Sequence, residues 1–347
     1  PEHPFFARKR RHKKGCYPIV LEDAAWTDAS VLTDGHYLCV PKIKTKRSDT
    51  EIDLVGYALP HGRSGASGIS GRTVRSIPLN ADTAWLIGLY VAEGSSSPTV
   101  RFSLGAHEDE IMERVERISS DIGYSASRSY AKDSAACTVS LGTSVWGRWL
   151  KQHCGADAHD KHVPEVVLHH ADPAIRRAFV EGVQDGDGYE RKWNADGSHR
   201  LYAIKTASKS LMHDLVLLLA QDGIGCHTSV ELQRPRNIDG YIMPDGVLYG
   251  VAFNPDGARP TERTLNGKAI QSYSHRWKAD DDGVWYPITS IGSRRHAGPV
   301  YNMTTVDHTY IVHSYLVHNC DAEINDDLRD AGCDMSDAVL PSTIGCD

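Results

Sequence analysis

The sequence predicts an α+β protein in which short β segments at both ends enclose a helix-rich, duplicated insertion. Short alternating apolar stretches with turn signals fill residues 1–79, and comparable β patterns return in residues 266–319. Between them, residues 80–265 contain longer segments with helical periodicity that occur twice. Residues 320–347 are acidic and form a last, separate piece. We therefore expect four regions with these boundaries.

The bulk composition is that of a globular protein outside the membrane. Apolar residues make up 40% of the chain and charged residues 24%, and no apolar run is long enough to span a bilayer. The net charge of −7 argues mildly against a nucleic-acid binder that uses its whole surface, but it allows a local basic groove. The basic run RKRRHKK at residues 8–14 is either a solvated loop or a patch that contacts phosphates.

The cysteines and the chain ends indicate an intracellular fragment. None of the eight cysteines forms a C-x-x-C pair, so we expect reduced thiols and no structural zinc site. The opening PEHPFFARKRRHKKG has no Met and no apolar signal region, and the closing STIGCD ends like an interrupted strand. We expect both ends to be cuts, no membrane partner, and a cytoplasmic location in a bacterial, archaeal or phage-infected cell.

The first region contains a recognisable strand and a linker. GHYLCVPKI at residues 35–43 alternates apolar and polar positions, and Asp34-Gly35 supplies a turn before it. GRSGASGISGRT at residues 62–73 is rich in Gly and Ser, which favours a linker. From about residue 80 the pattern changes to longer helices.

Two helices head the internal repeat. The first begins at Asn80 or Asp82 as N-cap and ends at Gly94, and the second has Asp172 as N-cap and ends at Gly188. Each is followed by a β-like stretch, TVRFSLG or LYAIKTAS, and then by a helix that ends in Asp-Ile-Gly or Asp-Gly-Ile. Two copies of helix–strand–helix predict a domain with pseudo-two-fold symmetry.

The two head helices end in a shared pattern, LIGLYVAEG and VEGVQDGDG. Aligned, each has Gly at its third place, an acid at its eighth and Gly at its ninth. Gly88 and Gly182 would let the helices approach closely, which would place Glu93 and Asp187 side by side. Carboxylates at helix C-termini repel the local partial charge and each other. A bound Mg²⁺ would relieve this repulsion, and the recurrence favours this interpretation over two solvated acids.

These two stretches resemble the paired dodecapeptide motifs of LAGLIDADG homing endonucleases. The resemblance implies that Glu93 and Asp187 bind Mg²⁺ and cut one strand each of a long, asymmetric double-stranded DNA target. It also implies an assisting lysine upstream of the second motif, and Lys161 in DKHVPEVVL occupies that place; an ordinary exposed lysine is an equally good interpretation. A catalytically inactive module that only binds DNA or aids RNA splicing is the alternative.

The stretch TYIVHSYLVHNC ends in three residues that suit a self-cleaving junction. The side-chain nitrogen of Asn319 can attack its own backbone carbonyl, which closes a succinimide and breaks the following peptide bond. His318 lies next to it and titrates near neutrality. The thiolate of Cys320 is a nucleophile toward a thioester. His308 lies one strand upstream, where a hairpin would bring it near the junction.

VYNMTTVDHTYIVHSYLVHNC resembles the C-terminal splicing motifs of inteins, and PEHPFFARKR resembles the later half of an N-terminal intein motif. The resemblance implies an all-β Hint-type splicing domain that the endonuclease interrupts, and a host-protein stub, or C-extein, at residues 320–347. It implies that His3 assists the initial N-to-S acyl shift and Cys320 receives the N-extein. His308 and His318 would promote cyclisation of Asn319.

The sequence departs from the intein pattern at two places. The usual first Cys or Ser would precede Pro1, and Asn302 stands where many inteins have Asp. We therefore expect cleavage at Asn319, with joining dependent on the protein's own N-terminal intein segment and exteins. A hedgehog-like autoprocessing domain is an alternative that the Asn319 terminus disfavours. The tail AVLPSTIGCD weakly resembles a phage large terminase subunit, and a generic α/β strand explains it as well.

Overall fold

A computed structural model gives the fold of most of the chain. It describes residues 3–12, 19–44, 46–57, 74–97, 99–132, 135–142, 145–192, 200–238, 241–243, 245–255, 260–265, 268–273, 277–293, 303 and 305–319. The expected linker at 62–73, Asn302, Cys320 and the expected stub lie outside the described residues. In the described part of the chain, no helix combines the length and apolar character needed to cross a membrane.

The chain forms two compact units, one of residues Pro1–Cys39 with Pro287–Asp347 and one of residues Val40–Tyr286. β-rich end segments therefore come together, and the segment between them forms a body of its own. The unit boundaries differ from the domain boundaries predicted at 79/80 and 265/266. Residues 40–57 belong with the helix-rich unit because their backbone is hydrogen-bonded to it, as described below.

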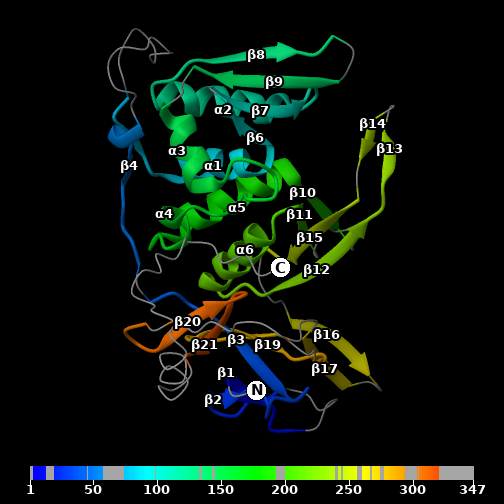
Figure 1. Ribbon diagram of the computed structural model, residues 1–347. Helices are drawn as coiled ribbons and strands as arrows, with labels where there is room; N and C mark the ends of the chain where they lie inside the picture. The colour runs from blue at the N-terminus through cyan, green and yellow to red at the C-terminus, as the bar shows by residue number, and fades with distance from the viewer. Residues whose placement is uncertain are drawn as a thin grey trace. The chain divides into compact units, whose positions relative to one another are not determined.

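The first unit is built on a mixed-length antiparallel sheet. The strands of this sheet that lie mainly in the first unit are β1 (Pro4–Lys9), β2 (Ala25–Asp28), β3 (His36–Pro41, with its last two residues in the second unit), β20 (Thr309–Val312) and β21 (Tyr315–His318). β1 pairs with β2, β3 and β21, and β21 pairs with β20. Ala7, Tyr37 and Val317 are buried in its core. The first and last segments of the described chain thus meet in one sheet (Figure 1).

A two-residue turn fixes the register of the β20–β21 hairpin. His313 and Ser314 have φ angles of 48° and 72°, the left-handed conformation that type I′ turns require at both central positions. The resulting register pairs Thr309 with His318. His308 and Asn319, one residue further on in each direction, therefore face each other at the open end of the hairpin.

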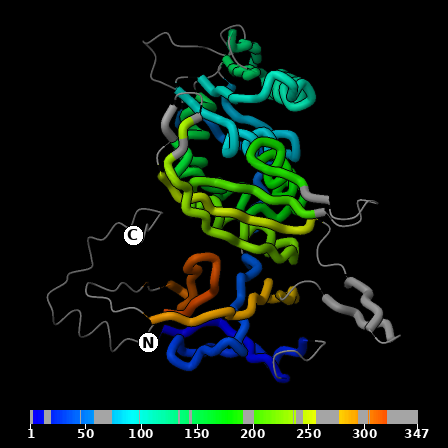
Figure 2. The backbone as a smooth tube through the Cα atoms, turned by 90° about the vertical axis from the view of Figure 1, so that its right-hand side faces the viewer, coloured from blue at the N-terminus to red at the C-terminus, as the bar shows by residue number. Residues whose placement is uncertain are grey.

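The second unit contains the predicted duplication. The first repeat consists of α1 (Ala81–Glu93), β6 (Gly94–Ser96), β7 (Val100–Gly105), α2 (Asp109–Asp121), β8 (Ala126–Tyr130) and β9 (Ala136–Leu141). The second consists of α5 (Pro173–Asp187), β10 (Gly188–Lys192), β11 (Arg200–Thr206), α6 (Lys209–Gln221), β12 (Cys226–Gln233) and β15 (Gly246–Phe253). The sheet orders are β6-β7-β9-β8 and β10-β11-β15-β12, so the strands take the same places in both. The matching topology confirms the repeat. Figure 2 traces the backbone through both copies, with the second copy in green to yellow.

The remaining elements of the described chain are not duplicated. Two helices between the repeats, α3 (Val145–Cys154) and α4 (Glu165–Leu168), had no counterpart among the sequence predictions. The others are β4 (Glu51–Asp53), the 3₁₀ helix η1 (Val55–Tyr57), β5 (Ser76–Pro78), β13 (Arg236–Ile238), β14 (Tyr241–Met243), β16 (Pro260–Leu265), β17 (Lys268–Tyr273), β18 (Lys278–Ala279) and β19 (Gly283–Pro287).

The predicted caps delimit the two head helices. The Asn80 side chain accepts a hydrogen bond from the Thr83 amide, so Asn80 and not Asp82 is the N-cap of α1. Asp172 caps α5 in the same way, with Pro173 at the first helical position. Each helix ends one residue before a glycine, Gly94 or Gly188, and that glycine has an extended backbone conformation. The acids Glu93 and Asp187 are therefore the last helical residues.

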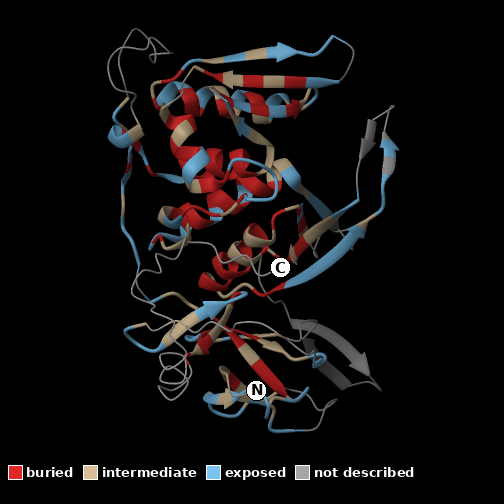
Figure 3. Ribbon diagram, in the orientation of Figure 1, coloured by how far each residue is buried: buried red, intermediate tan, exposed pale blue. Residues whose placement is uncertain are grey.

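Glycines let α1 and α5 pack with their backbones in contact. A Cβ atom added to Gly88 would lie 2.1 Å from the Phe179 carbonyl oxygen, and one added to Gly182 would lie 2.0 Å from the Trp85 carbonyl oxygen. Both of these oxygens are backbone atoms, so a change of side-chain rotamer could not relieve the clash. Figure 3 shows α1 and α5 as mostly buried helices. The close approach predicted for this pair is confirmed.

We expect Gly182→Ala to destabilise the second unit by about 3 kcal/mol, a typical cost of overpacking a tight contact. In an exposed helix the same substitution would stabilise the protein by about 1 kcal/mol. The close contact at Gly182 therefore reverses the sign of the change in the free energy of unfolding. Urea unfolding measures the change. Gly246→Ala is the matched control, because a Cβ there meets nothing within 4 Å. A Gly182→Ala protein as stable as the control would contradict the packing.

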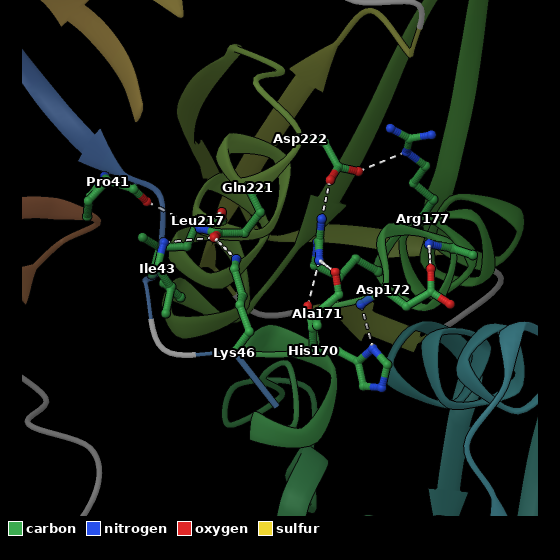
Figure 4. A network of polar contacts seen from close by, with 12 residues as sticks. Pro41, Ile43, Lys46, His170, Ala171, Asp172, Arg177, Leu217, Gln221 and Asp222 are labelled. Atoms are coloured by element: carbon green, nitrogen blue, oxygen red, sulfur yellow. Dashed lines mark hydrogen bonds and ion pairs between the residues drawn. The ribbon is translucent and has the colours of Figure 1, made fainter. Parts of the chain in front are cut away.

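Polar contacts attach residues 41–49 to the second repeat (Figure 4). The Gln221 side chain accepts from the Ile43 amide at 2.8 Å and from Lys46 Nζ at 2.6 Å, and it donates to the Pro41 carbonyl at 3.2 Å. Beside it, Asp222 accepts from Arg177 Nε at 2.8 Å and pairs with Arg176. These contacts fix where the chain enters the helix-rich unit.

Candidate functional site

The two acids predicted from the repeat lie at adjacent helix ends in the second unit. At Gly186, one residue before Asp187, an added Cβ would lie 2.5 Å from the Ala92 Cβ and 3.1 Å from the Glu93 Cγ. The last turns of α1 and α5 are thus in contact, and the structure brings Glu93 and Asp187 together at the same end of the helix pair.

Burial makes this acid pair difficult to ionise. It raises the pKa of Glu93 to about 7, with the charges of Asp187 and then Glu108 adding to the effect. Burial also raises the pKa of Asp187 to about 6, while the charge of Lys161 acts in the opposite direction. The fold therefore favours the neutral acids, and stability contributed by them is lost as the pH rises toward these values. A cation bound between the carboxylates would reverse this preference.

Lys161 is buried at the C-terminal end of α1. The alternative interpretation, an ordinary exposed lysine, is therefore wrong. Its ammonium group donates to the carbonyl oxygens of Tyr90 and Gly94, both at 3.0 Å, and lies 3.9 Å from the centre of the Tyr90 ring. Burial lowers its pKa to about 8. The positive charge thus stabilises the C-terminus of the helix that carries Glu93.

A hydrogen bond across the helix pair, which sequence reasoning missed, supports the acid pair. The Trp85 indole of α1 donates to the Asp185 carboxylate of α5 at 2.7 Å. Arg114 covers the Trp85 ring at 4.1 Å and donates to Glu181 at 2.5 Å. Because Asp185 lies in the last turn of α5, this bond helps set the position of Asp187 against α1.

Each four-stranded sheet has an open polar face. In the first sheet, residues in register on that face include Arg101 with Ser140 and Ser103 with Thr138. In the second sheet, Lys205 and Ser229 both pair with Gly250, and Lys205 Nζ lies 2.5 Å from the Glu231 carboxylate. β12 is exposed along most of its length (Figure 3). Hydroxyl and cationic groups in rows of this kind can hydrogen-bond to base edges and phosphates.

The second group of predicted residues lies in the first unit, around Asn319. This residue is 8% exposed, and its amide Nδ2 lies 3.1 Å from His308 Nδ1. Its backbone N–H donates to the His308 carbonyl at 2.9 Å. Nδ1 of His318 lies 2.8 Å from the Asn319 carbonyl oxygen, the acceptor that cyclisation would polarise. Both histidines thus contact the residue that the sequence predicted to be cleaved.

Aromatic contacts orient the histidines. His308 and His318 stack with ring centres 5.8 Å apart, and the Trp26 ring of β2 meets His318 edge-on at 5.1 Å. His3 lies further along the sheet, with Nε2 3.5 Å from the Tyr310 hydroxyl. Burial lowers the pKa of His3, which favours the neutral imidazole of a base. Trp26 was not predicted, because only the pairing of β2 with β1 reveals its position.

No family model matches the chain. Among curated proteins, the ATP-dependent DNA helicase Hel308 of Thermococcus kodakarensis is 26% identical over 258 residues, which cover 72% of this chain and 22% of the helicase. A DNA polymerase of the same organism is 26% identical over 277 residues, or 70% of this chain and 16% of the polymerase. The replication factor C small subunit of Methanocaldococcus jannaschii is 25% identical over 170 residues, or 44% and 9%. The chain spans less than a quarter of each relative.

Solved structures that resemble the chain include LAGLIDADG domains. The homing endonuclease I-DmoI in complex with DNA and Mn has a TM-score of 0.33 and 11% identity, and the match covers 50% of this chain and 89% of that chain. A second I-DmoI complex, with its target DNA nicked, has the same TM-score and identity and covers 50% and 88%. The N-terminal LAGLIDADG domain of DUF199/WhiA has a TM-score of 0.32 and 14% identity, covering 49% and 74%. Both likenesses are weak, so the fold rests on the duplicated topology of the chain itself.

Proposed function

We propose that the second unit is a metal-dependent endonuclease that cuts double-stranded DNA at a specific site. The observation that carries the proposal is the acid pair, Glu93 and Asp187, held at adjacent helix ends with raised pKa values. Burial disfavours ionisation of both carboxyl groups, and a hard cation bound between their oxygens would stabilise the ionised form. Mg²⁺ bound there would supply charge stabilisation at a scissile phosphate. The open polar sheet faces are suited to the flanking duplex.

We further propose that the first unit is a splicing domain of the intein type, and that the endonuclease is inserted in it. In this proposal, Asn319 Nδ2 bonds to its own carbonyl carbon, and the peptide bond to Cys320 breaks. His318 Nδ1, 2.8 Å from the carbonyl oxygen, would stabilise charge on that atom, and the released amine of Cys320 takes up a proton. His3 would assist the earlier acyl shift, and Cys320 would receive the acyl group.

The similarity to proteins of three different kinds supports an inserted element. A DNA helicase, a replication factor C small subunit and a DNA polymerase are different proteins, yet each matches this chain over a minor share of its own length. A segment common to such proteins is better explained by insertion than by a shared host activity. Cleavage of the uninterrupted host gene would be the means by which such an element spreads.

We expect a duplex of the host gene lacking the insertion to be cut on both strands only when Mg²⁺ is present. At Mg²⁺ concentrations too low to saturate the site, activity should rise as the pH passes through about 6 and 7, because both acids must be ionised to hold the cation. Gel electrophoresis of end-labelled DNA, with excess chelator as control, measures this. Specific binding without any cutting across that pH range would favour the alternative, a module that only binds DNA.

A further inference from the structure

The backbone of His308 has an unfavourable conformation. Its φ angle is 58°, in the left-handed region that non-glycine residues adopt at a cost. This same residue contacts Asn319 twice, through its carbonyl oxygen at 2.9 Å and through imidazole Nδ1 at 3.1 Å. Both contacts depend on the conformation, because rotating φ into the ordinary region would redirect the carbonyl and the side chain together.

Side chains on both sides of His308 hold this conformation. The carboxylate of Asp307 accepts from the Thr309 amide at 3.2 Å and so bridges over residue 308. The Thr305 hydroxyl donates to the Thr309 carbonyl at 2.9 Å, and the His308 amide donates to the Thr305 carbonyl at 3.2 Å. A carboxylate that accepts from the amide two residues later forms an Asx-turn, which stabilises the backbone conformation of the residue between them.

His308 contacts Asn319 and His318 on one side, and the local hydrogen bonds of Asp307 and Thr305 hold its backbone on the other. Val306, Asp307 and His308 are all exposed. The hydrogen bonds from Thr309 lower the pKa of Asp307, so its carboxylate is ionised, and therefore an acceptor only, at neutral pH.

We propose that Asp307 is a positioning residue for peptide-bond cleavage after Asn319. It fixes the left-handed backbone of His308 and thereby places the His308 imidazole and carbonyl against the Asn319 amide groups. The inference rests on the proposed splicing function and names a further residue for it. Asp307 itself contacts neither the attacking nitrogen nor the scissile bond.

A double-mutant cycle on the full chain tests this inference. The measured quantity is the rate at which the 320–347 peptide is released, followed by mass spectrometry. We expect Asp307→Ala to slow release about tenfold, because the hydrogen bond that stabilises the left-handed conformation of residue 308 is lost. Asp307→Asn keeps the acceptor oxygen and should remain within about twofold of wild type, and Asp307→Ser should be intermediate. Asp307→Ala combined with His308→Ala should be no slower than His308→Ala alone.

The outcomes separate the inference from the function on which it rests. Wild-type release by His308→Ala would contradict the proposed role of His308 and the inference with it. Slow release by His308→Ala together with wild-type release by Asp307→Ala would overturn the inference alone. Additive losses in the double variant, or an Asp307→Asn protein as slow as Asp307→Ala, would also overturn it. Asp281→Ala, at an exposed turn of the other unit, is the control and should not change the rate.

Discussion

Glu93→Gln and Asp187→Asn are each expected to abolish double-strand cutting by the protein, because each variant lacks one of the two acids proposed to hold the metal. Removal of one charge-stabilising group typically costs about 10²- to 10³-fold in rate. Each change replaces an ionisable oxygen ligand with an amide of the same shape. Folding should survive, because burial already disfavours the charged form of both acids and raises their pKa values to about 7 and 6. The amide side chain is neutral, as burial already favours at both positions.

The measurement distinguishes loss of chemistry from loss of binding. Supercoiled plasmid carrying the target would be followed to nicked and linear forms, and binding would be measured by gel shift. Both variants should bind and neither should produce linear DNA. Glu110→Gln removes the same charge from an exposed position in the first turn of α2 and should cut normally. Linear product from either active-site variant at the rate of this control would refute the assignment.

The two proposed activities should also be separable. Release of the 320–347 peptide should be unaffected in Glu93→Gln and Asp187→Asn, because these acids and Asn319 belong to different compact units. Peptide release that fell together with DNA cutting would contradict the division of labour between the units.

Local signals in the sequence were enough to predict the repeat and its ends. Asn80, Asp172 and the glycines after each helix are cap residues whose effect depends on the neighbouring backbone alone. The acids could be placed because they occupy the same position in two copies of one pattern. The hairpin was likewise predictable in outline, since its two strands are separated by a two-residue turn.

Features that depend on distant residues were not predictable in this way. The indole of Trp85 and the carboxylate of Asp185 are joined at 2.7 Å but are 100 residues apart in sequence. Trp26 reaches His318 only because β2 and β21 pair with the same strand, β1. Helix α3, whose tryptophans are buried, was not predicted because it lies outside the repeating unit that marks the other helices.

Asn319→Ala is expected to abolish release of the 320–347 peptide altogether. Alanine has no side-chain nitrogen to attack the carbonyl carbon, so the succinimide cannot form and no other group replaces it. The backbone contacts should persist, since the hydrogen bond from the residue 319 amide to the His308 carbonyl does not use the side chain. The variant therefore tests the chemistry while leaving the hairpin in place.

The proposed reaction depends entirely on one atom, the side-chain nitrogen of Asn319. His308 and His318 each contact Asn319 at hydrogen-bond distance, and general acid–base or polarising groups of this kind typically contribute about 10²- to 10⁴-fold. Their removal should slow release, whereas removal of the attacking nitrogen should stop it. Mass spectrometry of Asn319→Ala, beside Asn237→Ala as a control in the other unit, measures the difference. Peptide released from Asn319→Ala as fast as from that control would mean that cleavage at this junction proceeds without cyclisation, and the proposed splicing role of the first unit would fall with it.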